Sequence, residues 1–248
     1  RMPTLSGARR RGFPSAAIRT FWERMGYSKQ VATIEYSVLE ACVREVLDAE
    51  ASRRLAVLDP LPIAIINLPA EHRETLRFSN HPKDEAQGTR DVPFSPRLYI
   101  EREDFAEVPP KGFHRLVPGG EVRLRGIGIV RCEDVVKNDA GDVTELRVSL
   151  DTSTRPGLPG AERKVKGTIH WVCAHSAIEA EVRLYDRLFD VPNPDDDSDG
   201  KTYRDHLNPG SKRIVRGYLE PSLANVGTES RFQFERLGYF VSDQFDHT

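Results

Sequence analysis

The sequence predicts a mainly β protein with a helical subdomain at its N-terminus. In the first 50 residues apolar side chains recur at helical spacing. From Arg54 onward they alternate in short segments that Gly, Pro, Asn and Asp separate, which is typical of strands in β-barrels or sandwiches. With 248 residues, 38% of them hydrophobic, the chain can form one sizeable core or two or three small ones.

Two helices are predicted in the N-terminal part. Ser15 is expected to cap the first helix, and Gly26 is expected to end it. The apolar residues expected on one face of this helix are Ala17, Ile18, Phe21, Trp22 and Met25. Thr33 is expected to cap the second helix, in which apolar residues from Ile34 to Leu47 recur at helical spacing.

Turn residues divide the β region. Asn138–Asp142 is predicted to be a hairpin turn between a strand ending near Val136 and one starting near Val143. Two long loops are predicted, at residues 152–162, rich in Pro and Gly, and at residues 192–200, rich in Asp. The acidic loop is interpreted as solvated, because it lacks the ligand spacing of a calcium-binding loop.

Composition limits the functional classes. The net charge is -2, so a nucleic-acid binder of this composition must concentrate its Lys and Arg locally. Three widely spaced cysteines favour a reduced, cytoplasmic protein. No apolar run reaches the roughly 20 residues of a membrane span. The opening residues, Arg1–Pro3, are typical of the middle of a longer polypeptide.

No complete active site is visible in the sequence. It contains neither a phosphate-binding glycine loop nor a motif around a nucleophilic serine. His170, Cys173 and His175 lie close enough in sequence to suggest a metal site, but strand alternation directs His170 and Cys173 to opposite faces. A structural role is therefore the favoured interpretation, and no metal ligand is assigned.

Local basic clusters are the better indication of function. They are Arg9–Arg11, Arg53–Arg54, His114–Arg115, Arg123 with Arg125, Lys164 with Lys166, and Arg231 with Arg236. Arginines at alternate strand positions can face a phosphate backbone, and a guanidinium fork can bind a base edge. The alternative is a solvated strand face with acidic neighbours such as Glu121 and Glu235.

Ten sequence blocks resemble the glutaminyl-tRNA synthetase family, in the part that binds the anticodon. In chain order they are Met2–Gly12, Ser28–Gln30, Thr33–Glu35, Ala56–Pro60, Asn80–Lys83, Gly88–Ser95, Tyr99–Phe105, Gly120–Arg125, Lys164–Pro194 and Phe232–Phe240. They are spread over nearly the whole chain in family order, which is more specific than any single motif.

The resemblance implies a three-part architecture. Residues 1–53 would form a helical subdomain that contacts the inner corner of the tRNA. Residues 54–105 plus 190–248 would form a first, proximal β-barrel, and residues 106–189 a second, distal one, both of the anticodon-binding type.

The resemblance also implies a parent enzyme that attaches glutamine to tRNA-Gln using ATP with Mg²⁺, as a monomer without a membrane segment. The catalytic domain would precede Arg1, so no catalytic residue or cofactor is assigned here, and the chain alone is expected to be inactive. Two alternatives stay open: the anticodon-binding part of a glutamyl-tRNA synthetase, or a non-catalytic β-barrel interaction module.

Ten residues are implied to contact tRNA. Ser28, Gln30 and Glu35 would approach the inner corner. The central anticodon base would be read by Arg53, Gln233 and Arg236, and the third base by Arg115. The first base or its phosphate would face Arg123, Arg125 and His114. His114 and Gly112 stand where the family has Lys and Gln, so less positive charge is expected there.

Overall fold

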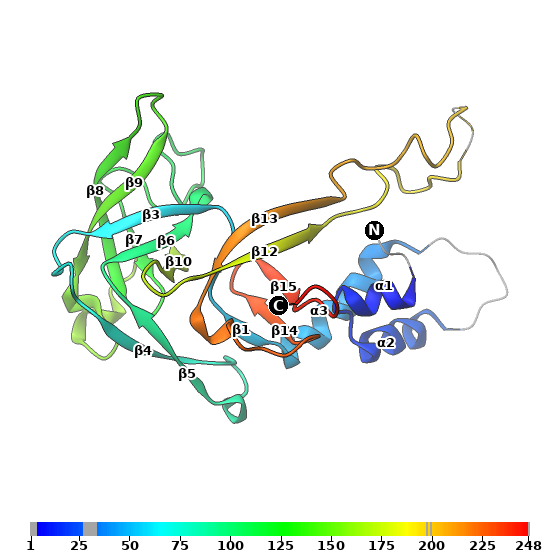
Figure 1. Ribbon diagram of the computed structural model, residues 1–248, viewed down its shortest axis with the longest axis horizontal. Helices are drawn as coiled ribbons and strands as arrows, with labels where there is room; N and C mark the ends of the chain where they lie inside the picture. Colours follow the sequence, from blue (N-terminus) through cyan, green and yellow to red (C-terminus); the bar gives the residue numbers. More distant parts are fainter. Residues whose placement is uncertain (1–3, 27–33, 197, 199, 248) are drawn as a thin grey trace. The chain divides into compact units, whose positions relative to one another are not determined.

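The structure of the chain is a computed structural model that describes residues 4–26, 34–196, 198 and 200–247 (Figure 1). The helices are α1 (Leu5–Arg10), α2 (Ser15–Met25) and α3 (Tyr36–Glu50), with 3-10 turns η1 (Glu85–Gln87), η2 (Arg102–Asp104), η3 (Thr152–Thr154), η4 (Pro159–Glu162) and η5 (Pro221–Leu223). The strands are β1 (Ser52–Arg54), β2 (Ala56–Val57), β3 (Pro60–Ile65), β4 (Glu74–Ser79), β5 (Thr89–Phe94), β6 (Arg97–Glu101), β7 (Glu121–Leu124), β8 (Gly128–Lys137), β9 (Val143–Asp151), β10 (Thr168–Ile169), β11 (Val172–Cys173), β12 (Ile178–Tyr185), β13 (Lys212–Leu219), β14 (Arg231–Phe234) and β15 (Gly238–Val241).

The chain divides into two compact units, each built from separate stretches of sequence. The first unit comprises residues 1–52, 182–215 and 226–248, and the second comprises residues 53–181 and 216–225. Strands dominate after α3, which confirms the predicted mainly β class with N-terminal helices. The division into a helical subdomain and two barrels stays a prediction.

The second unit contains a seven-stranded sheet, in the order β10-β7-β8-β9-β3-β6-β11, and a separate two-stranded sheet of β4 and β5. Its long hairpin pairs β8 with β9, and the turn between them confirms the predicted turn at Asn138–Asp142. The side chain of Asn138 holds this turn, because its Oδ1 accepts from the N–H groups of Ala140 and Asp142 at 3.0 and 2.9 Å. The edge strand β10 pairs in parallel with β7.

Trp171 lies in the core of the second unit. Its side chain is fully buried and meets Phe94 and Phe78 edge to face, with ring centroids 5.9 and 6.4 Å apart. The indole N–H donates to the carbonyl of Arg125 at 2.8 Å. The same core contains buried aliphatic residues of β3, β6, β7 and β9. His170 and Cys173 are also buried in this unit, and their structural role stays a prediction.

A buried ion pair joins distant segments of the second unit. Nε and Nη2 of Arg90 lie 2.5 and 3.1 Å from the carboxylate of Glu220, and the two side chains are 6% and 2% exposed. Glu220 also accepts from the N–H of Leu55 at 2.9 Å and from the hydroxyl of Ser222. Burial, followed by the charge of Arg90, lowers the pKa of the nearby Arg54.

The helices of the first unit surround a small core of their own. Phe13, Ala17, Val43 and Leu47 are among its buried members. The predicted cap at Ser15 is wrong: Ser15 is the first helical residue of α2, and Pro14 precedes it without a side-chain cap. Trp22 was also misassigned to the apolar face, because it is 62% exposed.

The second predicted helix is α3, which begins at Tyr36 with Glu35 as its N-cap residue, while Thr33 lies outside the described residues. In the part of the chain that the structure covers, no helix has the length and apolar character of a membrane span.

Candidate nucleic-acid interface

Arg115 carries a guanidinium group that two acidic side chains orient. Its Nε lies 3.1 Å from Oδ1 of Asp104, which is fully buried. Its Nη1 donates to the carbonyl of Glu103 at 3.0 Å and lies 3.3 Å from the carboxylate of the same residue. Among the described residues these contacts use Nε and Nη1, so the donors of Nη2 stay available to a ligand.

Backbone pairing places Arg115 next to this buried carboxylate. The N–H of Leu116 donates to the carbonyl of Asp104 at 3.0 Å, and the N–H of Ala106 donates to the carbonyl of Leu116 at 3.1 Å. Leu116 itself is fully buried. The chain immediately after Arg115 is therefore fixed, while the Arg115 side chain is 36% exposed.

His114 is exposed and lies against the segment before β10. A Cβ atom on Gly167 would stand 2.0 Å from the carbonyl oxygen of His114. Only glycine leaves room for this approach, because real Cβ atoms do not come that close to a backbone oxygen. Lys164 and Lys166, whose alternate spacing would place them on one face of a strand, do not lie on one, since β10 begins only at Thr168.

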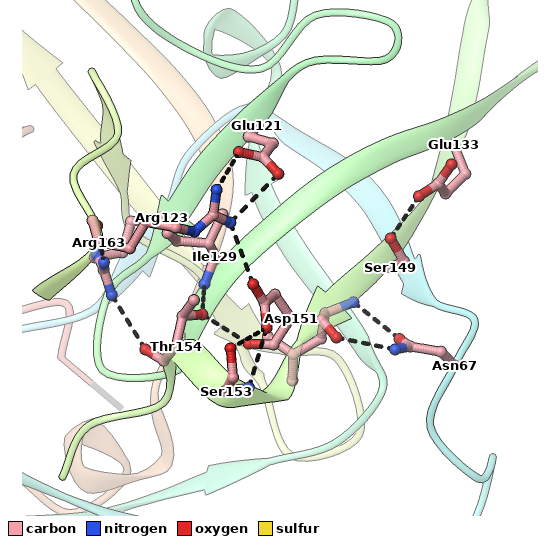
Figure 2. A network of polar contacts seen from close by, with 11 residues as sticks. Asn67, Glu121, Arg123, Ile129, Glu133, Ser149, Asp151, Ser153, Thr154 and Arg163 are labelled. Atoms are coloured by element: carbon pink, nitrogen blue, oxygen red, sulfur yellow. Dashed lines mark hydrogen bonds and ion pairs between the residues drawn. The ribbon is translucent and has the colours of Figure 1, made fainter. Parts of the chain in front are cut away.

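The side chain of Arg123 donates hydrogen bonds to two backbone carbonyls of the second unit. Its Nη1 donates to the carbonyl of Thr154 at 3.3 Å and its Nη2 to the carbonyl of Arg163 at 2.6 Å. Figure 2 shows this part of β7 beside the segment that contains η3 and η4. These bonds hold residues 154–163 against β7. The role of Arg123 at the first anticodon base stays a prediction.

Arg163 and two acidic residues form the rest of this network (Figure 2). Arg163 donates from Nη1 and Nη2 to Glu121 at 2.8 and 3.3 Å, and from Nη2 to Asp151 at 3.3 Å. Hydrogen bonds from Ser153, and next the charge of Arg163, lower the pKa of Asp151 against the opposing effect of burial. The network neutralises Arg163 and ties the end of η4 to β7 and β9.

Arg125 follows β7 and has an exposed side chain. Its backbone is fixed on both sides, because its N–H donates to Ile169 at 3.0 Å and its carbonyl accepts from Trp171. The structure thus brings His114, Arg115, Arg123 and Arg125 into one unit. Their contacts with a nucleic acid stay predictions.

The predicted readers of the central base belong to both units. Arg53 opens the second unit; it is buried, and its N–H donates to Asn80 at 2.7 Å. In the first unit, Gln233 lies half-buried on β14 between the buried Phe232 and Phe234. Arg236 is exposed in the turn to β15 with a φ of 67°, which is uncommon for a residue other than glycine.

The inner-corner residues are described only in part. Ser28 and Gln30 lie outside the described residues. Glu35 is exposed, and its carboxylate accepts from the hydroxyl of Ser37 at 3.1 Å. Glu35 is the N-cap residue of α3, where a carboxylate interacts favourably with the helix dipole.

The basic run Arg9–Arg11 is engaged inside the first unit. Arg9 and Arg10 lie on α1, a helix that the sequence did not predict. Arg9 pairs with Glu229 at 2.9 Å. The guanidinium of Arg11 lies over the rings of Phe13 and Tyr185, 5.1 and 5.6 Å from their centroids. This run is therefore committed to intramolecular contacts.

Asp243 is the acidic centre of these contacts. Arg10 donates to it from Nε and Nη2 at 3.0 Å each, and the N–H groups of Phe245 and Asp246 donate at 2.8 and 3.0 Å. Burial opposes ionisation, but the hydrogen bonds outweigh it and lower the pKa of Asp243 from 3.8 to about 2.

Asp243→Asn is expected to destabilise the protein by about 1 kcal/mol near neutral pH, a value discounted for the partial exposure of the pair. Because the folded pKa of about 2 lies below the ordinary 3.8, the carboxylate stabilises the fold above about pH 4 and loses this effect as the pH falls through 2. Urea unfolding followed by circular dichroism at several pH values measures the difference.

Asp91→Asn, in an exposed pair with Arg77, is the control. A loss for Asp243→Asn that is independent of pH would contradict the assignment.

Sequence analysis missed two sets of groups that orient the arginines of this candidate interface. Asp104 lies within the block Tyr99–Phe105, but nothing in the pattern marks it as the partner of Arg115. The carbonyls that bind Arg123 are invisible to any residue-based pattern. Among the described residues, no group of three or more His, Cys, Asp or Glu side chains could hold a metal ion.

Comparison with known proteins identifies what the chain resembles. Two family models described as "tRNA synthetases class I (E and Q), anti-codon binding domain" match residues 51–151 and 168–243. Three relatives are named glutamine–tRNA ligase. They come from Xanthomonas campestris pv. campestris (strain 8004), 64% identical over 248 residues, Xanthomonas oryzae pv. oryzae (strain MAFF 311018), 65% over 248, and Xylella fastidiosa (strain 9a5c), 62% over 247.

Each of these matches covers 100% of this chain and 43% of the relative. The chain therefore spans less than half the length of the curated relatives it matches. The resemblance carried by the ten sequence blocks is confirmed.

Proposed function

Because the chain belongs to the anticodon-binding domain family of class I tRNA synthetases (E and Q), we propose that it binds a tRNA at the anticodon. The observation that carries this proposal is the 64% identity, over the whole chain, to a protein named glutamine–tRNA ligase. The relatives' name makes tRNA-Gln the proposed partner.

The activity of the whole protein is proposed from the same name. It would attach glutamine to tRNA-Gln using ATP with Mg²⁺, as a cytoplasmic monomer. The present chain would contribute recognition of the anticodon and the inner corner. Its proposed division into residues 1–53, 54–105 plus 190–248, and 106–189 belongs to this proposal.

The geometry of Arg115 supports base reading. A guanidinium that Asp104 and Glu103 hold from one side loses little conformational entropy when it meets a ligand. Guanine offers O6 and N7 to such a group, and RNA-binding proteins read unstacked bases by hydrogen bonds to these edges.

A binding titration tests the proposed function. The 248-residue chain is expected to bind a tRNA-Gln transcript with an affinity that falls steeply with salt, because phosphate contacts release counterions. tRNA-Glu and a tRNA-Gln with an altered third anticodon base are expected to bind more weakly. Absence of tRNA-Gln binding at low salt would overturn the proposal, and preference for tRNA-Glu would favour the glutamyl alternative.

Arg115→Ala is expected to reduce discrimination at the third anticodon base by about 1–3 kcal/mol. Arg115→Lys is expected to lose discrimination as well, because Lys lacks the planar fork, while it keeps a cation beside the buried Asp104. Filter binding with the four third-base variants measures the effect.

The matched control for both variants is Arg147→Ala, which removes an exposed arginine of β9. It should leave discrimination unchanged. If Arg115→Ala and Arg115→Lys, both verified as folded by circular dichroism, discriminate as the wild type does, the assignment of Arg115 is wrong.

A further inference from the structure

We propose that Lys164 and Lys166 form a binding site for backbone phosphates, beside the surface that carries His114 and Arg115. This inference rests on the proposed function and adds to it a pair of residues assigned no ligand so far. The site would hold the nucleic acid in place without reading its sequence.

The two lysines differ from the neighbouring arginines in their ion pairing. Arg163 is paired with Glu121 and Asp151, and Arg115 with Asp104 and Glu103. Lys164 and Lys166 are exposed, and within the part of the chain that the structure describes neither forms an ion pair or a hydrogen bond through its side chain. Their charge is therefore available to an external anion.

The backbone that carries the lysines is fixed on both sides. Arg123 donates from Nη2 to the carbonyl of Arg163 at 2.6 Å, and its own N–H donates to the carbonyl of Gly167 at 3.0 Å. One residue of β7 thus holds the chain immediately before Lys164 and immediately after Lys166. Between them Val165 is half-buried, which orients this short segment further.

The same segment lies against the loop that carries the predicted base readers. The contact between Gly167 and the carbonyl of His114 is so close that no side chain fits at position 167. Arg115 follows His114 directly. The segment that carries the lysines therefore adjoins the loop that carries Arg115. A nucleic-acid strand that offers a base to Arg115 would present its phosphates to this segment.

The chemistry of lysine favours phosphate over a base edge. Its ammonium group is a compact charge on a flexible stem, which suits a phosphate oxygen, whereas a base edge is read best by a planar fork.

A structural alternative exists, because lysines near the edge of a sheet hinder aggregation. Lys164 and Lys166 lie within four residues of the start of β10, the edge strand of the seven-stranded sheet. In that case any charge, positive or negative, would serve equally well. The sign of the charge therefore separates the two roles.

The test compares tRNA-Gln binding by wild type and by Lys164→Gln/Lys166→Gln as a function of salt. The double variant is expected to bind about tenfold more weakly near physiological salt, and the slope of log K against log salt is expected to fall by about 1.5. The ratio of affinities between anticodon variants should not change. Lys137→Gln, an exposed lysine at the end of β8 paired with Glu107, is the control and should behave as wild type.

Lys164→Glu/Lys166→Glu provides the second variant. It keeps the edge charged but is expected to weaken tRNA binding about a hundredfold, because it repels phosphate. Wild-type affinity in both double variants overturns the phosphate site while leaving the proposed function intact. Failure of the wild type itself to bind tRNA overturns both. A change in anticodon discrimination would show base reading instead.

Discussion

Glu220→Ala is expected to lower the free energy of unfolding by about 3–5 kcal/mol, because it removes one partner of a buried ion pair. Arg90 would keep a positive charge at 6% side-chain exposure without its carboxylate. The N–H of Leu55 would lose its acceptor as well. Urea unfolding followed by circular dichroism measures the loss.

Two comparisons make this experiment specific. Glu179→Ala breaks the exposed pair with Arg216, whose side chains are 49% and 84% exposed, and should change stability by less than about 1 kcal/mol. Replacing both buried partners, as in Arg90→Met/Glu220→Leu, should restore part of the lost stability, since the charge of Arg90 is removed together with its partner. The recovery is expected to be incomplete, because Arg54, whose Nε lies 3.7 Å from Glu220, and the N–H of Leu55 still lose this carboxylate. Equal losses for Glu220→Ala and Glu179→Ala would show that the buried pair has no special role.

Trp171→Ala is expected to destabilise the protein by about 3–5 kcal/mol, because it removes a fully buried indole from the core of the second unit. The loss combines the contacts with Phe78 and Phe94 and the hydrogen bond to the carbonyl of Arg125. Trp171→Phe keeps an aromatic ring and removes the donor, so a smaller loss of about 1–3 kcal/mol is expected.

The second tryptophan supplies the control. Trp22 is 62% exposed, and Trp22→Phe should change stability by no more than about 0.5 kcal/mol. Denaturant unfolding monitored by circular dichroism compares all three variants on one scale. A loss for Trp171→Ala as small as that for Trp22→Phe would contradict the packing described here.

Local chemistry explains what the sequence predicted correctly. The turn at Asn138–Asp142 was predictable because Asn and Gly determine the backbone within a few residues. The change from helical to alternating periodicity near Arg54 likewise marked the end of α3 and the start of the strands. Both signals depend only on neighbours in the sequence.

Contacts between residues that are far apart in the sequence explain what the sequence analysis missed. The role of Arg123 depends on the carbonyls of Thr154 and Arg163, which any residue type could provide. Arg115 is oriented by Asp104 through a pairing of two irregular segments. The basic run at Arg9–Arg11 looked available for a ligand because its acidic partners lie more than 200 residues later. Charge patterns along a sequence do not show which charges the fold pairs.

The interleaving of the two units has a consequence for how the chain folds. Arg9 meets Glu229 across 220 positions, and Leu55 meets Glu220 across 165. Contacts of such high contact order form slowly, because a long loop must close before they contribute. During synthesis from the N-terminus, α1 and β2 leave the ribosome long before their partners exist. We therefore expect the second unit to complete its folding only after translation has passed Glu220, and the first unit only after it has passed Asp246.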